Sequence, residues 1–262
     1  MSSAELPFFS VVIPCYNVKQ GFTDLVKSLE QQTYKNFEAI FVDDGSKPEN
    51  LDRLHTIVKS ADLNCKVIES KVNGGPAMAR NLGIADARGE YVCFLDSDDM
   101  WFPEKLETVY CVVENSRPRI LGHLVVHGQE SIDESTEPII FNTLDMLVKN
   151  RSNTSALVVR RSDIELFDTK MRYCEDYDFI LRHSATEGMV FLPKLLAARD
   201  RPVLAKGGIS ERIHLMRLGE LKVYTKFCMS HPLRIWMMPF LWVYSLAKHA
   251  YKMSLSKRAC CE

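Results

Sequence analysis

The sequence predicts an α/β fold on a mainly parallel sheet flanked by helices, with a helical extension at its C-terminal end. Short apolar runs alternate with helix-length amphipathic segments over the first 115 residues, which is typical of βαβ units. Most of these runs end in turns rich in Asp, Gly or Ser. Of the 262 residues 46% are hydrophobic and 26% are charged. These values exclude a disordered, collagen-like or coiled-coil chain.

The elements of the first half follow from the spacing of the apolar residues. We expect strands at residues 9–13, 37–42, 65–68 and 91–95, and helices at residues 21–32, 49–61, 76–87 and 103–114. Phe22, Leu25 and Leu29 fall on one face of the first helix, as an amphipathic helix requires. Pro76 and Pro103 stand at helix starts, where a missing N–H removes no hydrogen bond.

The second half has a looser pattern and divides the chain into two parts. We expect strands at residues 120–127 and 156–160, helices at 143–149 and 175–187, short edge strands at 189–192 and 195–198, and a loop or irregular hairpin at 128–138. After Gly208 the chain is predicted to be helical and basic to about Ser230. We therefore predict an α/β domain over residues 1–205 and a helical extension over residues 206–262.

Charge is balanced overall but not along the chain. The net charge is −1, and nothing in the composition points to nucleic acid, yet residues 200–262 carry 11 Lys or Arg against 4 Asp or Glu. Such a basic end favours phosphate groups or an anionic membrane as partner. Residues 235–246 contain no charge and include two Trp, but a spanning helix needs about 20 apolar residues. A segment lying in a membrane interface and a core helix that closes the domain both fit.

The eight cysteines fit neither a C-x-x-C pair nor a zinc spacing, and no signal peptide is visible. We expect free thiols, mostly in the core, and a reducing, cytoplasmic location. The pair Cys260 and Cys261 is either an acylation site or a plain terminus.

Polar and acidic residues follow three of the predicted strands. Asn17 ends the first of these turns, Asp43 and Asp44 lie in the second, and Asp96 and Asp98 in the third. Because parallel strands place ligands at their carboxyl ends, we expect these side chains to converge. Carboxylates this close need a cation or donors to remain ionised together. Mg²⁺ and Mn²⁺ accept such oxygen ligands together with phosphates, whereas solvated surface turns are the alternative.

Five segments together resemble glycosyltransferase family 2. They are Ser-Val-Val-Ile-Pro-Cys-Tyr-Asn at 10–17, Val-Asp-Asp-Gly-Ser at 42–46, Gly-Gly-Pro-Ala-Met-Ala-Arg-Asn-Leu-Gly at 74–83, Gly-Glu-Tyr-Val-Cys-Phe-Leu-Asp-Ser-Asp-Asp at 89–99 and Glu-Asp-Tyr-Asp-Phe at 175–179. The resemblance extends to about residue 200. It implies a GT-A (Rossmann-like) fold and inverting transfer from a nucleotide-sugar.

The resemblance also implies a role for each matching position. The nucleotide-sugar site would comprise Pro14, Tyr16, Asn17, Asp43, Asp44, Arg80, Asp96, Ser97 and Arg212. Tyr16 would pack on the nucleobase and Asp44 would accept a hydrogen bond from a uracil N–H. Mn²⁺ or Mg²⁺ would be held by Asp98, Asp96 and His214. Asp176 would be the general base with Glu175 supporting it, although Asp is also favoured in the first turn of any helix.

The function that follows is transfer of a hexose or N-acetylhexosamine from a UDP-sugar, with a dTDP-sugar as second choice. The acceptor would be a saccharide, lipid-linked, in the synthesis of O-antigen, capsule or lipooligosaccharide. Residues 120–153 and 207–217 would form the acceptor subsite. The protein would then act as a peripheral protein on the cytoplasmic face of the inner membrane.

The sequence argues against three other classes of protein. A nucleotidyltransferase needs a Gly-rich basic loop after the first strand, and a dinucleotide-dependent dehydrogenase needs G-x-G-x-x-G there. The sequence has Pro-Cys-Tyr-Asn at that place instead. A catalytically silent nucleotide-sugar-binding scaffold in a polysaccharide assembly complex remains the alternative, and the intact Asp-x-Asp and Glu-Asp motifs argue against it.

Overall fold

The computed structural model describes residues 6–19, 21–127, 137–199, 213–230 and 232–259, the last eight by backbone alone. These residues form a nine-stranded sheet of order β3-β2-β1-β4-β8-β6-β9-β5, with β7 paired to β9. The strands are β1 (Phe9–Cys15), β2 (Phe37–Asp44), β3 (Cys65–Ser70), β4 (Tyr91–Phe94), β5 (Asp99–Trp101), β6 (Ile120–His127), β7 (Ile139–Phe141), β8 (Val158–Arg160) and β9 (Met189–Arg199).

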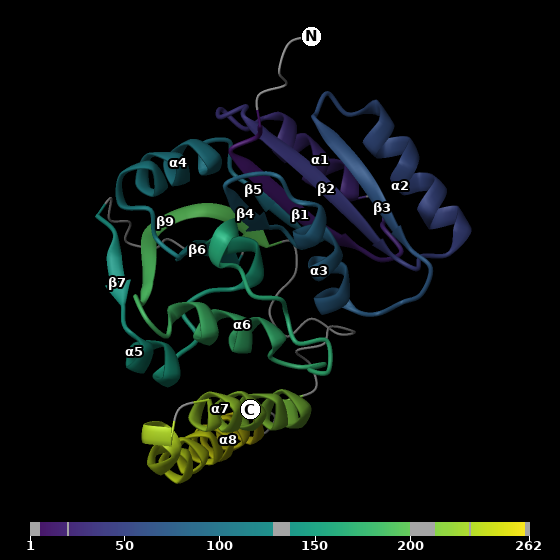
Figure 1. Ribbon diagram of the computed structural model, residues 1–262. Coiled ribbons are helices and arrows are strands. Elements are labelled where there is room, and N and C mark those ends of the chain that lie inside the picture. The colour runs from purple at the N-terminus through teal and green to yellow at the C-terminus, as the bar shows by residue number, and fades with distance from the viewer. Residues whose placement is uncertain (1–5, 20, 128–136, 200–212, 231, 260–262) are drawn as a thin grey trace.

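Helices cover both faces of this sheet (Figure 1). The helices are α1 (Phe22–Glu30), α2 (Pro48–Ser60), α3 (Pro76–Asp86), α4 (Lys105–Ser116), α5 (Thr143–Val148), α6 (Glu175–Ser184), α7 (Ile213–Met229) and α8 (Met238–Ala259), with 3-10 turns η1 (Thr154–Ala156), η2 (Arg161–Asp163) and η4 (Pro232–Met237). The predicted helices and strands of the first 115 residues are therefore confirmed within a few residues. The sequence did not predict β5 and β7.

The strand periodicity divides the core into two clusters. Val12 and Phe94 face one cluster, which continues into α3 and α6, whereas Val11 and Phe41 face the other, which is completed by α1, α2 and α4. Because successive side chains of a strand point to opposite faces, a strand buried on both faces reads as a continuous apolar run. β1 to β4 pair in parallel and place their carboxyl ends at one edge.

The prediction of two short edge strands near residue 190 was wrong. The structure has one long strand, β9, which lies inside the sheet between β6 and β5. Its pairing with β6 shifts register opposite His123 and Leu124, where Pro193 and Lys194 are accommodated. A bulge of this kind lets a strand continue past a proline, which removes one ladder hydrogen bond. The break in the apolar pattern marks that bulge rather than the end of a strand.

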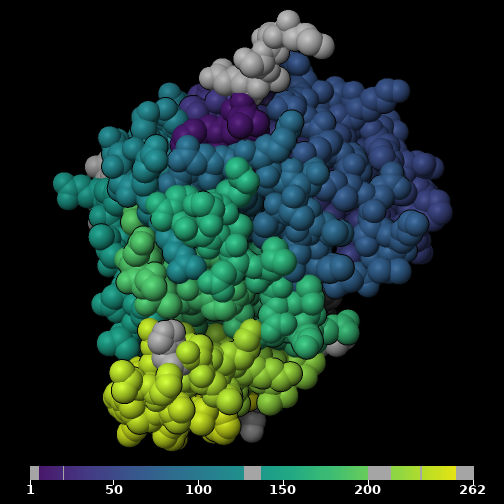
Figure 2. Space-filling model, viewed as in Figure 1, coloured from purple at the N-terminus to yellow at the C-terminus, as the bar shows by residue number. Residues whose placement is uncertain are grey.

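The C-terminal end of the described chain forms a helical hairpin, made of α7, η4 and α8, which we call the C-terminal hairpin. Figure 2 shows it as one continuous end of the molecule, packed below α6. Val223, Tyr224 and Phe227 of α7 are buried in the same cluster as α6. The core-helix alternative concerned residues 235–246, which lie in η4 and α8 and leave Trp236, Phe240 and Val243 exposed. The predicted domain boundary at residue 205, most of the loop at 128–138, Cys260 and Cys261 lie outside the described residues.

The six described cysteines are free thiols, and Cys15, Cys93, Cys174 and Cys228 are buried, as the sequence predicted. No helix in the described part of the chain combines the length and apolar character needed to cross a membrane.

Candidate active site

The carboxyl ends of β1, β2 and β4 meet at one edge of the sheet, as predicted. Cys15 at the end of β1 is in register with Asp43 of β2, and β1 also pairs with β4. Pro14 lies in β1, and the Tyr16 side chain that follows is 54% exposed, so its ring is free to receive a flat ligand. Parallel pairing therefore gathers three sequence-distant turns into one candidate donor site.

Asp44 organises the loop between β3 and α3. Its two carboxylate oxygens accept hydrogen bonds from the backbone N–H groups of Gly74 and Gly75, both at 2.8 Å. Gly75 has φ of +83°, a conformation that residues with a side chain rarely adopt. Burial raises the pKa of Asp44 despite these two donors, with Asp43 adding to the rise.

The turn after β1 is tied to the start of α2. Asn17 has a positive φ of 47°, and its side-chain oxygen accepts hydrogen bonds from the Lys47 N–H and the Asn50 amide, both at 3.0 Å. Asp43 accepts a hydrogen bond from the Ser46 N–H at 3.0 Å, while its other oxygen is buried and has no hydrogen-bond partner in the described structure. Asn17 is therefore occupied by the protein itself, whereas Asp43 retains an unused acceptor.

Arg80 joins two parts of the site that are far apart in the sequence. It lies in α3, is almost fully buried, and its guanidinium is 2.7 Å from Asp96 and 3.4 Å from Glu175. The guanidinium also lies 5.4 Å from the centre of the Phe167 ring. Burial by itself would lower the pKa of Arg80, but Asp96 and Glu175 raise it above its usual value. Arg80 is thus a permanent cation between the end of β4 and the start of α6.

Glu175 and Asp176 form the first residues of α6, after Cys174 in a left-handed conformation. One oxygen of Asp176 accepts a hydrogen bond from the Tyr177 N–H at 2.8 Å. Burial raises the pKa of Asp176, and the nearby Asp96 raises it further. Burial also raises the pKa of Glu175, against the lowering effect of Arg80. A carboxylate whose charged form is disfavoured in this way accepts protons more readily than an exposed one.

The acidic turn after β4 contains one exposed carboxylate and one buried carboxylate. Asp98 is exposed, and Ser97 is half-buried. Asp99 begins β5, is buried, and accepts a hydrogen bond from the Ser155 hydroxyl. The Asp96 N–H in turn donates to the Ser155 oxygen at 3.1 Å. Asp99 therefore does not cap the acidic turn, because pairing of β5 with β9 draws this residue into the interior.

These residues fit a divalent cation only when the donor's phosphates share it. Within the described residues no group of three His, Cys, Asp or Glu side chains could hold a metal ion. Asp98 is exposed beside Asp96, which suits Mg²⁺ or Mn²⁺ because these ions take one or two carboxylates and complete their shell with phosphate and water. His214 lies on α7 with its ring 5.0 Å from that of His249. Its predicted role as a metal ligand stays a prediction, and Arg212 lies outside the described residues.

Sequence reasoning did not identify Ser155 and Phe167 as parts of the site. Ser155 orients the backbone at Asp96 and binds Asp99, and Phe167 packs under Arg80. A lone Ser in the turn η1 and a lone Phe in a loop have no spacing pattern that would point to the site. Only the pairing of β8 with β4 brings η1 to this edge.

The parallel β3-β2-β1-β4 half, joined to a mixed half and carrying acidic turns after β2 and β4, defines the GT-A fold class. The model of the family described as Glycosyl transferase family 2 matches residues 10–187. The chain belongs to glycosyltransferase family 2, as the sequence predicted.

Two bacterial relatives show the extent of the similarity. A glycosyltransferase of Haemophilus influenzae is 33% identical over 183 residues, which cover 66% of this chain and 60% of that protein. The amylovoran biosynthesis glycosyltransferase AmsB of Erwinia amylovora is 32% identical over 193 residues, covering 66% of this chain and 63% of AmsB. The matched region thus makes up about three fifths of each relative's length.

Solved structures share the fold at low sequence identity. TarS of S. aureus, residues 1–349 in complex with UDP-GlcNAc, has a TM-score of 0.65 at 21% identity, covering 92% of this chain and 80% of that fragment. The mannosyltransferase PcManGT of Pyrobaculum calidifontis, in complex with GDP-Man and Mn²⁺, has a TM-score of 0.67 at 13% identity, covering 99% of this chain and 82% of PcManGT. These likenesses establish the fold.

Proposed function

We propose that the protein is a metal-dependent inverting glycosyltransferase that moves a hexose or N-acetylhexosamine from a UDP-sugar to a saccharide acceptor. The observation that carries the proposal is the Arg80 bridge. It holds Asp96, at the donor end of β4, and Glu175, beside the candidate base Asp176, against a single buried cation. This bridge supports the proposal that the donor-binding residues and the candidate base belong to the same site.

In the proposed reaction Asp176 accepts the proton of the acceptor hydroxyl as it attacks the anomeric carbon. Attack from the face opposite the leaving diphosphate inverts the configuration. General base catalysis of this kind contributes about 10²–10⁴-fold. The salt bridge between Arg80 and Glu175 fixes the start of α6 and so the position of Asp176. Asp98 and Asp96 would hold a divalent cation, which would supply charge stabilisation for the leaving diphosphate.

The donor assignment rests on the acidic turn after β2 and on one structural neighbour. TarS binds UDP-GlcNAc, whereas PcManGT binds GDP-Man, so the fold accommodates both nucleotides. We favour UDP, with dTDP second, because Asp44 and Asp43 suit a uracil-type N–H donor. Asp43 retains a buried oxygen without a partner in the described chain, which supports such a contact.

Calorimetric titration of the purified protein with UDP, dTDP and GDP, with and without Mn²⁺, tests the donor site. We expect UDP to bind only with metal, and Asp98→Ala to remove this binding. Asp62→Ala, at another exposed aspartate in the turn after α2, serves as the matched control. If no nucleotide binds to the folded protein, the donor assignment fails.

Turnover separates an enzyme from the silent scaffold. We expect metal-dependent release of UDP from a UDP-sugar in the presence of acceptor, and loss of this release in Asp176→Asn with UDP binding retained. UDP binding without turnover on any UDP-sugar would support the scaffold in its place.

We further propose that the acceptor is lipid-linked, in surface polysaccharide synthesis, and that the protein works at the cytoplasmic face of the inner membrane. AmsB acts in amylovoran biosynthesis by its name, which supports a polysaccharide product. On the C-terminal hairpin Leu233, Trp236, Phe240 and Val243 are 87%, 66%, 69% and 67% exposed. A soluble surface seldom leaves so many large apolar side chains in water on one element. Aromatic residues next to basic ones suit a membrane interface.

Sedimentation with lipid vesicles tests the membrane contact. We expect binding to phosphatidylglycerol vesicles that weakens with salt and is absent on phosphatidylcholine vesicles. The double variant Trp236→Ser, Phe240→Ser should abolish this binding, and Leu144→Ser, at a residue of α5 that is 60% exposed, should leave it unchanged. Equal sedimentation of the double variant would contradict the contact.

A further inference from the structure

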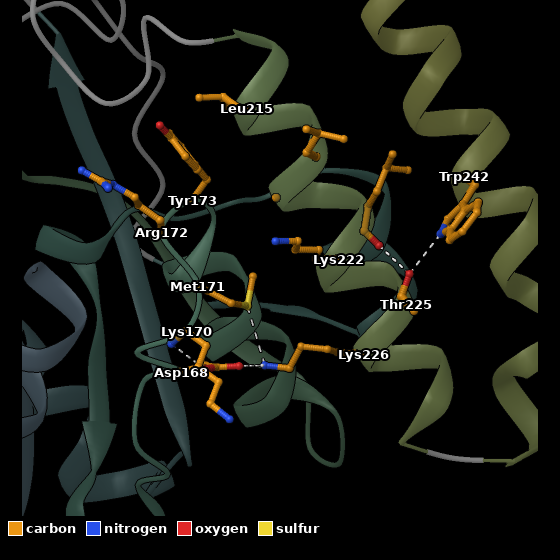
Figure 3. A pocket seen from close by; sticks show the side chains of 13 residues that line it. Asp168, Lys170, Met171, Arg172, Tyr173, Leu215, Lys222, Thr225, Lys226 and Trp242 are labelled. Carbon is orange, nitrogen blue, oxygen red and sulfur yellow. Dashed lines mark hydrogen bonds and ion pairs between the residues drawn. The ribbon is translucent and has the colours of Figure 1, made fainter.

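A cavity of about 640 Å³ lies outside the donor site, between the loop that precedes α6 and the C-terminal hairpin. Figure 3 shows its two walls: residues 168–173 on one side, and α7 with Trp242 of α8 on the other. This volume is within the range of sites for small organic ligands, which is about 300–1,000 Å³.

The lining is apolar with unpaired cations. Met171, Leu215 and Leu218 supply apolar surface, and Lys170, Arg172 and Lys222 add positive charge. Lys226, at one end of the cavity, is neutralised by Asp168 at 2.7 Å and Asp178 at 2.9 Å. The described residues show no ion pair for the other three cations.

Apolar side chains and positive charges in the same cavity indicate which class of ligand it would bind. A purely apolar ligand would make no ion pair with Lys170, Arg172 or Lys222. A free sugar or nucleotide would place polar groups against the apolar side chains of the cavity. An aliphatic chain that carries a phosphate or diphosphate satisfies both, since apolar burial and charge-assisted hydrogen bonds then act together.

The cavity is lined by the segment that precedes the candidate base in the sequence. Tyr173, in its wall, lies two residues before Glu175, and the Cys174 thiol donates to the Met216 carbonyl of α7 at 3.3 Å. α7 approaches this loop so closely that a side-chain carbon on Gly219 would lie 2.8 Å from the Tyr173 carbonyl oxygen. An occupant gripped by α7 therefore lies against the segment that leads directly into Asp176.

One wall of the cavity comes from the same hairpin that carries the surface proposed to contact the membrane. Trp242 lines the cavity from α8 and is 42% exposed, and its neighbours Phe240 and Val243 belong to the surface proposed to contact the membrane.

We propose that this cavity binds the lipid phosphate of the acceptor: an aliphatic chain in contact with Leu218 and Trp242, and a phosphate or diphosphate held by Lys222 and its neighbouring cations. The assignment rests on the proposed glycosyl transfer. It places the sugar that the phosphate carries beside the start of α6.

Calorimetric titration of the full chain with four probes below their micelle concentrations tests this site. The probes are farnesyl phosphate, farnesol, inorganic phosphate and short-chain phosphatidylglycerol. We expect farnesyl phosphate to bind most tightly, because losing a hydrogen bond to a charged group weakens affinity by about tenfold or more. Lys222→Glu and Leu218→Asp, both at exposed positions, should each lose about tenfold in affinity for it. Lys59→Glu, at an exposed position in α2, is the control.

Several results would contradict the proposed lipid-phosphate site. Failure of farnesyl phosphate to bind, equal binding of inorganic phosphate, or unchanged binding by Lys222→Glu would overturn the site. Tighter binding of phosphatidylglycerol would overturn the acceptor role in favour of a bilayer lipid. UDP binding is measured on the same samples: its absence together with farnesyl phosphate binding would reject the proposed function and the acceptor role, and would leave only a lipid-phosphate site in the cavity.

Discussion

Arg80 shows how one buried side chain can decide both stability and chemistry. Its guanidinium contacts two carboxylates from segments 16 and 95 residues away in the sequence. A planar guanidinium can hold two carboxylates at once, whereas a lysine ammonium is a point charge on a flexible stem. We therefore expect the protein to need both the positive charge and the shape of Arg80.

We expect Arg80→Lys to lower kcat/KM by about a hundredfold, because the ammonium cannot hold Asp96 and Glu175 together. The unfolding free energy should fall by about 1–3 kcal/mol, the cost of a buried polar group left without its partner. Steady-state kinetics and urea unfolding measure the two effects. Arg117→Lys, at a residue whose side chain is 70% exposed, is the control and should change neither. Full activity of Arg80→Lys would show that the bridge is dispensable.

Asp176 differs from Arg80, because its charged form is disfavoured in the folded protein. Burial raises its pKa, so the folded state binds a proton more tightly than the unfolded chain does. We expect Asp176→Asn to reduce kcat by about 10²–10⁴-fold and yet to raise the unfolding free energy by about 0.5–2 kcal/mol. Thermal unfolding and turnover assays check both. A variant that is inactive and also less stable would indicate a structural carboxylate.

The same raised pKa predicts the pH dependence of activity. Because Asp176 must be ionised to accept a proton, kcat/KM should fall as the pH decreases through its raised pKa, that is, above the ordinary aspartate value near 4. A pH–rate profile between about pH 4 and 8 measures this. An acid limb at or below the ordinary aspartate value would argue against Asp176 as the base.

At the scale of elements, the loop between β3 and α3 binds Asp44 through its backbone N–H groups. The N–H groups of Gly74 and Gly75 hold Asp44, and this requires the positive φ of Gly75. The element thus fixes the donor turn by backbone geometry, which no side chain at this position can reproduce.

We expect Gly75→Ala to weaken UDP binding and to cost about 1–2 kcal/mol of stability, because alanine is strained at this φ even where space is open. Gly21→Ala is the matched control. Gly21 has φ of −65° and no atom within 4 Å of an added side-chain carbon, so alanine should be tolerated there. Titration with UDP and urea unfolding compare the two, and equal effects would remove the special role of Gly75.

At the scale of the whole molecule, Lys105 and His123 are buried and make no ion pair with the residues that the structure describes. Lys105 of α4 is fully buried, with its ammonium nitrogen 2.9 Å from the centre of the Trp101 ring, and burial lowers its pKa to about 7. Burial likewise lowers the pKa of His123 to about 3. The core is therefore less stable wherever these bases take up protons in the unfolded chain.

The lowered pKa of Lys105 determines how the stability of the protein changes with pH. Between its folded pKa of about 7 and its ordinary value near 10.5 the unfolded chain binds more protons, so this residue makes stability rise with pH over that window. We expect Lys105→Met to be more stable than the natural protein by about 1–3 kcal/mol at pH 7, and this difference to shrink toward pH 10. Urea unfolding of both proteins at several pH values tests it. A difference independent of pH would contradict a lowered pKa.

The C-terminal hairpin packs against the α/β core. Val223, Tyr224 and Phe227 are buried with Phe179 of α6, and the Tyr224 hydroxyl donates to the Leu147 carbonyl at 2.9 Å. We expect a chain ending at residue 205 to lose several kcal/mol of stability, since burying each large apolar side chain stabilises by about 1.5–3 kcal/mol. A melting temperature equal to that of the full chain would show instead that residues 1–205 fold as an independent domain.

The sequence by itself determined the alternation of strands and helices, the acidic turns and the family. These features are local: a period of two or 3.6 residues, a Pro at a helix start, or an Asp-x-Asp after an apolar run can be recognised without knowing the rest of the fold. Asp43, Asp44, Asp96 and Asp98 were found in this way, because parallel strands place their carboxyl ends together.

Only the tertiary structure decided which of these residues meet. The contact of Arg80 with Glu175, the burial of Asp99 by β5, the continuity of β9 past Pro193 and the division of the hairpin into a buried α7 and an exposed face of α8 all depend on pairings across long sequence separations. Local periodicity contains no information about such pairings, because they arise from the packing of whole elements. The cavity beside α6 has the same origin, since its walls come from a loop and two helices that no motif links.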